Sequence, residues 1–213
     1  MASGGNVAGA GQMAEGFPVA RAGRKIGLLG GSFDPAHEGH AHITREALKR
    51  FALDEVWWLV SPGNPLKTRG PAPMKKRLTE AHRVMRHPHV RITTLEQHLG
   101  TRFTAETLEA LTQHYAGVKF VWIMGADNLA SFHVWDRWRD IFAMVPIGVF
   151  ARPGERISAR MSPAAQKFRT SRIKASEATH LVSAVPPCWC FLNIPMRYES
   201  SSSLRADGEW TKD

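Results

Sequence analysis

The sequence predicts an α/β fold, in which a doubly wound parallel sheet lies between helices on both faces, in three layers. Short apolar runs alternate with segments of helical periodicity from residue 25 onward, and strands separated by helices form βαβ units. Their crossovers are almost always right-handed, which is how helices come to cover both faces. In addition, glycine, proline or polar residues follow most of the apolar runs, as expected where strands end at a ligand-binding edge.

Apolar runs of strand length predict the sheet, and the segments between them predict its helices. Residues 40–51, for example, carry Ile43, Ala47 and Phe51 near helical spacing. Residues 154–188 are less periodic, and we expect one or two helices there. Strands are expected at 26–30, 55–61, 90–95, 118–124, 147–151 and 191–194, and helices at 40–51, 73–86 and 104–115, with a short one capped by Asp127 and a closing one from Leu204.

Composition favours a folded chain of one domain. Residues 1–24 are rich in glycine and alanine, so we expect a disordered N-terminal extension, and residues 25–213 form the single domain. No apolar run approaches the roughly 18 residues of a membrane span, and the N-terminus lacks the apolar region of a secretory signal. We therefore expect a cytoplasmic protein without a membrane partner. Cys188 and Cys190 are expected to be reduced packing residues on one strand face.

The net charge of +9 points to polyanionic small substrates or to nucleic acid as partners. Lysine and arginine are spread along the chain, and no basic repeat with interleaved aromatic residues occurs. We therefore expect no nucleic-acid partner, although a basic RNA-binding protein stays open as an alternative of another class.

Ligands of doubly wound sheets bind beyond the carboxyl ends of the strands, where the strand order reverses. Sequences suited to a ligand follow five of the predicted strands. They are Gly30-Gly31, residues 61–67, residues 125–127, Arg152 and residues 200–205. Their shared position predicts one binding edge.

The segment GGSFDPAHEGH, residues 30–40, predicts a phosphate site at this edge. Gly30 and Gly31 allow the backbone to approach a phosphate, and Ser32 supplies a hydroxyl donor. The helix that follows favours negative charge at its N-terminus. His37 and His40 add side-chain donors that can stabilise negative charge as it develops.

Other phosphate and nucleophile motifs are missing from the sequence. There is no G-x-x-x-x-G-K-[ST] and no G-x-G-x-x-G, which disfavours a P-loop protein and a hydride-transferring dehydrogenase. Ser32 lacks the following glycine of a hydrolase elbow. A P-loop protein, a dehydrogenase and a hydrolase are therefore all disfavoured.

The histidine spacing resembles the HxGH signature of the nucleotidyltransferase superfamily related to class I aminoacyl-tRNA synthetases, whose fold is Rossmann-like. Between residues 25 and 205 the chain is similar to the bacterial nicotinate-nucleotide adenylyltransferases. Besides the turn, the matching motifs are SPGNPLK (61–67), RFTAETL (102–108), GADNLASFHVW (125–135), ARPG (151–154) and SSSSLR (200–205).

The resemblance implies adenylyl transfer from ATP to nicotinate mononucleotide, giving nicotinate adenine dinucleotide and pyrophosphate in NAD biosynthesis. His40 would be the main catalytic residue and His37 would assist. Mg²⁺ would be the cofactor, bound through the ATP phosphates without a protein metal site. ATP is expected to contact Gly30, Gly31, Ser32, Phe33, His37, His40, Gly125, Asp127, Arg152, Ser201, Ser202 and Arg205, and nicotinate mononucleotide to contact Asp34, Lys67, Thr104 and Trp135.

The chain departs from the family pattern at a few of these motifs. Leu66 stands where the family often has histidine, and Phe103 and Glu106 replace its tyrosine and aspartate. Glu199 and Ser202 replace its isoleucine and threonine. A sister adenylyltransferase acting on phosphopantetheine remains an alternative, although the motifs at 102–108 and 125–135 argue against it. A homo-oligomer is also compatible with the sequence.

Overall fold

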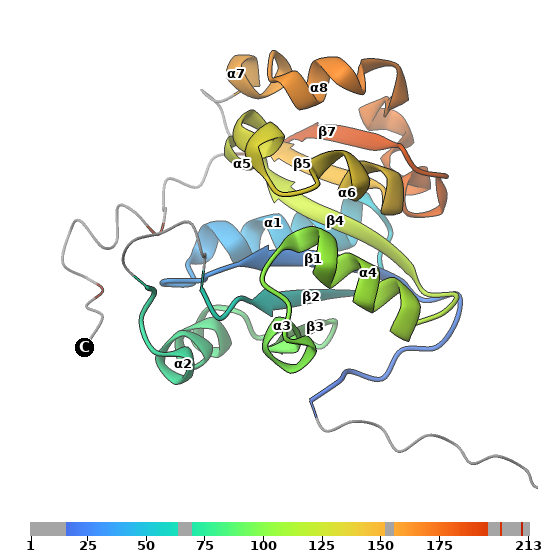
Figure 1. The fold of residues 1–213 in the computed structure, drawn as a ribbon. Helices are drawn as coiled ribbons and strands as arrows, with labels where there is room; N and C mark the ends of the chain where they lie inside the picture. Colours follow the sequence, from blue (N-terminus) through green and yellow to red (C-terminus); the bar gives the residue numbers. More distant parts are fainter. Residues whose placement is uncertain (1–15, 64–69, 152–155, 196–200, 202–209, 211–213) are drawn as a thin grey trace, which may run out of the picture.

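The fold is a seven-stranded parallel sheet with helices on both faces (Figure 1). The computed structural model describes residues 16–63, 70–151, 156–195, 201 and 210. The predicted α/β class is confirmed. The strands are β1 (Lys25–Gly31), β2 (Glu55–Val60), β3 (Val90–Thr93), β4 (Lys119–Gly125), β5 (Ile147–Ala151), β6 (Arg172–Ile173) and β7 (Trp189–Asn193).

The α-helices and 3-10 turns fill the connections between these strands. The α-helices are α1 (Glu38–Arg50), α2 (Met74–Val84), α3 (Leu95–Leu99), α4 (Thr104–His114), α5 (Ala126–Ser131), α6 (Trp138–Met144), α7 (Arg156–Arg160) and α8 (Pro163–Lys167), and the 3-10 turns are η1 (Phe132–Val134), η2 (Arg169–Ser171) and η3 (Ala175–Ser183).

The strand order is β3-β2-β1-β4-β5-β7-β6. The chain runs outward from β1 through β2 to β3, and then returns to place β4 on the other side of β1. The order therefore reverses between β1 and β4, where doubly wound sheets bind their ligands. Leu29 pairs with Ile123 in this register, which brings Gly31 and Gly125 to the same edge of the sheet.

Side chains alternate between two apolar cores, one on each face. Ile26 and Leu28 of β1 pack with α4 and α6, whereas Leu29 packs with α1 and α2. The neighbouring residues Trp57 and Trp58 of β2 divide in the same way, and both are fully buried. This period of two explains why runs buried on both faces read as continuously apolar.

Several predicted boundaries shift, and the short elements depart most from the expectations. Helix α1 begins at Glu38 with His37 as its N-cap, two residues before the predicted start. The strand expected at 90–95 ends at Thr93, and α3 follows it. Residues 156–183 form α7, α8, two 3-10 turns and the unforeseen strand β6. The last strand begins at Trp189, two residues early.

Residues 16–24 contact the rest of the fold, which differs from the disordered extension that the sequence predicts for residues 1–24; residues 1–15 lie outside the described ranges. Phe17 packs against the core beside His114, with ring centroids 4.7 Å apart. The Tyr115 hydroxyl donates to the Pro18 carbonyl at 2.9 Å. These contacts with α4 were missed because they join segments about a hundred residues apart.

Two further findings bear on the general character of the chain. Among the helices in the described ranges, none has the length and apolar character needed to cross a bilayer. Cys188 and Cys190 are free and buried, and both pack on the same face of the sheet, as predicted. Burial raises the pKa of Cys190 to about 11, so this thiol stays protonated near neutral pH.

Candidate active site

The turn after β1 is held by aromatic packing beneath it. Phe33 has a positive φ of 46°, and the residue is 1% exposed. The ring stacks on Trp58 with centroids 4.7 Å apart. Any contact between Phe33 and a ligand must therefore come from its backbone, because its side chain belongs to the core.

His37 and His40 form a reciprocal cap at the start of α1. The Gly39 N–H donates to His37 Nδ1 at 3.1 Å, and the His37 N–H donates to His40 Nδ1 at 3.3 Å. The two rings lie 3.9 Å apart between centroids. Because Nδ1 accepts in both rings, the neutral tautomer carries its proton on Nε2. The cap therefore fixes two Nε2–H donors beside the N-terminus of a 13-residue helix.

The two glycines at the end of β1 differ in what surrounds them. A Cβ on Gly30 would lie 2.4 Å from the ring of Trp122 on β4, whereas a Cβ on Gly31 would meet nothing closer than 3.7 Å. Gly30 is therefore required for packing. Gly31 has room for a Cβ, so packing does not require glycine there, and its phosphate contact stays a prediction.

Trp122 joins this turn to Trp135, the aromatic side chain predicted to stack on the nicotinate ring. The two indoles meet edge to face, with centroids 6.5 Å apart. Trp135 is half-buried and also contacts Phe132 at 4.9 Å. Although it belongs to the core on one side, Trp135 keeps a partly exposed ring at the ligand edge.

The start of α5 supplies the next part of the edge. Gly125 is the N-cap residue, so the prediction that Asp127 caps this helix is wrong. Asp127 lies in the first turn, and its Oδ1 would be 2.2 Å from a Cβ on Gly125. The exposed carboxylate of Asp127 thus lies over Gly125 and would have to shift to make room for a Cβ there.

Thr104 is the first residue of α4, and its neighbours explain one departure from the family pattern. Oε2 of Glu106 accepts the N–H groups of Arg102 and Phe103 at 3.2 and 3.3 Å. Glu106 therefore closes the helix N-terminus, as a carboxylate does at this position.

An ion pair connects the segment after Trp135 to α4. Nη1 of Arg137 donates to Oε2 of Glu109 on α4 at 3.0 Å, and Arg137 Nε donates to Asp140 at 2.8 Å. These bonds raise the pKa of Arg137. The pair ties the segment after Trp135 to the helix that begins at Thr104.

Ser201 and Trp210, the two described residues beyond residue 195, contact the same turn. The Ser201 hydroxyl donates to the Pro35 carbonyl at 2.8 Å, and the Trp210 indole N–H donates to Asp34 Oδ1 at 2.8 Å. Asp34 is only 5% exposed and also accepts the Ala72 N–H at 3.2 Å. Of the remaining predicted site residues, Lys67, Arg152, Ser202 and Arg205 lie outside the described residues, as do Leu66 and Glu199.

Sequence reasoning missed Arg77, which belongs to this site's framework. The sequence predicts it only as part of the helix at 73–86, yet it is 1% exposed and donates to three backbone carbonyls. A signal was present: Arg77 lies three residues after Met74 and four before Ala81, on the apolar stripe of α2. A charged residue on a buried stripe indicates a specific partner.

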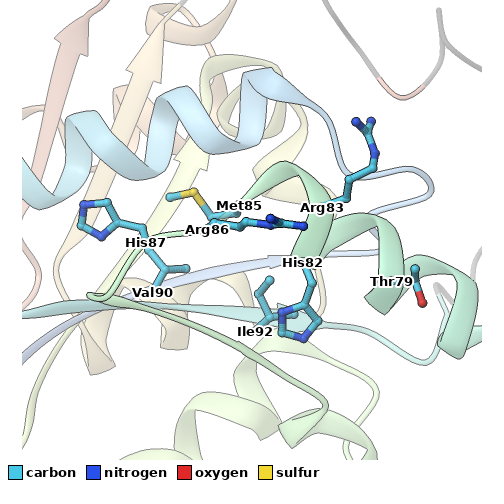
Figure 2. Close-up of a pocket in the computed structure, with 8 residues that line it drawn as sticks. All are labelled: Thr79, His82, Arg83, Met85, Arg86, His87, Val90 and Ile92. Carbon is cyan, nitrogen blue, oxygen red and sulfur yellow. The ribbon is translucent and has the colours of Figure 1, made fainter.

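A cavity of about 540 Å³ lies away from these groups, between the C-terminal half of α2 and β3 (Figure 2). Met85, Val90 and Ile92 contribute its apolar lining. His82 and Arg83 lie in the last turn of α2, where cations complement the helix dipole. The helix end therefore accounts for these basic side chains without a ligand.

Glu96 on α3 is the other unusual ionisable group. It is 7% exposed, and its carboxyl group makes no hydrogen bond or ion pair with another described residue. Burial raises its pKa to about 7. Glu96 therefore makes the stability of the fold depend on pH between about 4.5 and 7.

Comparison with known proteins agrees with this geometry. Residues 28–204 match the model of the cytidylyltransferase-like family. "Probable nicotinate-nucleotide adenylyltransferase" of Roseobacter denitrificans is 62% identical over 198 residues, which covers 93% of this chain and all of that protein. The protein of the same name from Ruegeria pomeroyi is 58% identical and covers 93% of each chain.

A solved structure shares the fold. The nicotinic acid mononucleotide adenylyltransferase of Plasmodium falciparum, in complex with NaAD, superposes with a TM-score of 0.67. It is 17% identical and covers 86% of this chain and 83% of its own. The extent and identity of the sequence matches decide the family: the chain is a cytidylyltransferase-like protein and belongs to the nicotinate-nucleotide adenylyltransferases.

Proposed function

We propose that the chain transfers the adenylyl group of ATP to nicotinate mononucleotide, forming nicotinate adenine dinucleotide and pyrophosphate in NAD biosynthesis. The observation that carries this proposal is the reciprocal cap of His37 and His40, which commits both Nδ1 atoms to the backbone. This cap supports the assignment of the Nε2–H groups as donors toward the sheet edge where the strand order reverses between β1 and β4.

In the proposed reaction, an oxygen of the mononucleotide phosphate attacks the α-phosphorus of ATP. The new P–O bond forms as the bond to the pyrophosphate oxygen breaks, and the electron pair leaves with pyrophosphate. The attacking oxygen is already anionic near neutral pH, so no base has to remove a proton. His40 donates to the α-phosphate as charge shifts in the transition state, and His37 supports it.

ATP would be bound by backbone and hydroxyl donors around the turn. The predicted contacts within the described residues are the backbone of Gly30, Gly31 and Phe33, the Ser32 hydroxyl, and Gly125, Asp127 and Ser201. The position of Ser201 beside Pro35 supports this assignment. Arg152, Ser202 and Arg205 complete the set as sequence-based predictions.

Nicotinate mononucleotide would lie on the side of the edge formed by Thr104 and Trp135. The partly exposed Trp135 ring can stack on the pyridine ring, and Lys67 is predicted to pair with a phosphate. Asp34 was predicted to contact this substrate as well. Its burial and its bonds to Ala72 and Trp210 instead favour an indirect role, in which it shapes the turn.

We propose Mg²⁺ as the metal and expect it to arrive with ATP. Within the described ranges, no three His, Cys, Asp or Glu side chains come together as a metal cage. The donors at the turn are N–H and hydroxyl groups, which suit phosphate oxygens that already carry the ion. When bound, Mg²⁺ supplies neutralising charge to the leaving pyrophosphate.

The remaining assignments are predictions of the sequence. They are a single domain over residues 25–213, a cytoplasmic location, independence from nucleic acid, and compatibility with a homo-oligomer.

An assay of pyrophosphate release with ATP and a panel of acceptors tests the proposed function. We expect release with nicotinate mononucleotide, much slower release with its amide analogue, and none with phosphopantetheine. Equal rates with the amide, or activity only with phosphopantetheine, would contradict the proposal. Binding of RNA with a steep salt dependence, without pyrophosphate release, would support the alternative class.

A further inference from the structure

Arg77 is a buried cation at the centre of the framework beneath the site. Its Nε donates to the Ala72 carbonyl at 2.7 Å. Its Nη1 donates to the carbonyls of Ser32 at 2.6 Å and Ser61 at 2.7 Å. The side chain thus joins three backbone segments: the turn after β1, the loop after β2, and the approach to α2.

Asp34 completes this arrangement. The Ala72 C=O accepts from Arg77, while the Ala72 N–H donates to Asp34 Oδ1 at 3.2 Å. Asp34 and Arg77 are 5% and 1% exposed, and the negative charge of Asp34 favours the charged form of the buried Arg77. Two points of the phosphate-binding turn, Ser32 and Asp34, are therefore fixed to the same anchor.

Planarity of the peptide bond gives this anchoring a direction. The C=O of Ser32 and the N–H of Phe33 belong to one peptide unit, and in a trans peptide they point in opposite directions. Arg77 holds the carbonyl inward, so the Phe33 N–H is aimed outward. Among the described residues, this N–H has no hydrogen-bond partner, although Phe33 itself is buried. A buried backbone N–H is rarely left unpaired unless a ligand or water accepts from it.

We propose that Arg77 is a positioning residue: by fixing the Ser32 carbonyl inward, it presents the Phe33 N–H to a phosphate of the bound nucleotides. Arginine suits this role because its planar fork donates in several fixed directions at once. Lysine would keep the charge, but its single nitrogen cannot reproduce the fork. Kinetic measurements of this role depend on the proposed adenylyl transfer, whereas measurements of ATP binding do not require that the protein catalyses this reaction.

The test compares Arg77→Lys with Arg83→Lys, a matched control on the same helix. Arg83 is exposed and pairs only with Glu80 among the described residues. We expect Arg77→Lys to weaken ATP binding by about 10-fold or more, the scale of one lost hydrogen bond to a charged group, and to lower kcat/KM at least as much. Arg83→Lys should match the unmodified protein in both.

Hydrogen exchange separates positioning from general destabilisation. ATP should protect the Phe33 amide in the unmodified protein and in Arg83→Lys, and should protect it much less in Arg77→Lys. Sucrose favours the folded state, so it is included if melting curves show that Arg77→Lys is partly unfolded. Arg77→Met, which keeps the length of the side chain without its donors, should lose at least as much affinity for ATP.

Folded Arg77→Lys with unchanged ATP affinity and unchanged protection of Phe33 would overturn the proposal. Lack of pyrophosphate release by the unmodified protein would instead refute adenylyl transfer and leave the ATP-binding comparison to decide the role of Arg77.

Discussion

Replacing Gly30 by alanine tests how the turn after β1 is coupled to the Trp135 ring. The added Cβ would lie 2.4 Å from the Trp122 ring, about 1 Å less than an ordinary carbon contact. Trp122 lies on β4, which pairs with β1 and β5, and is 2% exposed, so it has little room to move. Such overpacking costs about 1–3 kcal/mol. The melting temperature should fall by about 2–10 °C for a chain of this size.

The same shift should change substrate binding. The Trp122 and Trp135 rings meet edge to face, with centroids 6.5 Å apart. Displacement of the Trp122 ring should therefore move the Trp135 ring, on which the nicotinate ring is predicted to stack. We expect KM for nicotinate mononucleotide to rise at least about five-fold, since misplacing a binding group by about 1 Å can cost up to 10²-fold.

Gly31→Ala provides the matched comparison. Its Cβ would meet nothing closer than 3.7 Å, so its melting temperature should stay near that of the unmodified protein, and its main effect should fall on KM for ATP. Thermal unfolding and steady-state kinetics of both variants measure these effects. Two variants with equal melting temperatures, or Gly30→Ala with an unchanged KM for the mononucleotide, would refute the reasoning about Trp122.

Two further predictions concern single side chains. His40→Ala should lower kcat by about 10²-fold or more, the usual scale for losing one transition-state donor, with a far-ultraviolet spectrum that stays native; near-normal turnover would remove His40 from its role. Glu96→Gln should stabilise the protein at pH 8 and leave it unchanged at pH 4. The folded-state pKa of Glu96, about 7, lies above the ordinary value of 4.5, so its cost appears as pH rises through that window. This loss of stability reaches about 3 kcal/mol, or about 6 °C or more in melting temperature. Equal differences in melting temperature between Glu96→Gln and the unmodified protein at pH 4 and pH 8 would contradict this.

The sequence predicts the long elements well and the short ones poorly. Strands such as β2 and β4 are continuous apolar runs, and α1 carries an apolar stripe, so periodicity alone identifies them. Strand β6 has two residues and α3 has five. Elements this short form through tertiary contacts and leave no periodic signal.

In the candidate site, too, some features could be predicted from the sequence and others could not. The histidine pair and the glycine turn are contiguous in sequence, so their proximity could be predicted. The partners of Asp34 could not, because one of them, Trp210, lies 176 residues away. Arg77 was overlooked since a basic residue on a helix usually faces solvent. Gly30 was predicted to let the backbone approach a phosphate, whereas its surroundings show that packing against Trp122 requires glycine at this position.

Direct transfer between two bound phosphates, with histidine donors and no enzyme nucleophile, predicts one displacement at the α-phosphorus of ATP. The most direct measurement is the stereochemical course of the reaction, followed with ATP made chiral at that phosphorus and with nicotinate mononucleotide as acceptor. One in-line displacement gives a dinucleotide with inverted configuration. Retention would show two displacements through a covalent adenylyl–enzyme intermediate, and would contradict the role assigned to the turn and to His40.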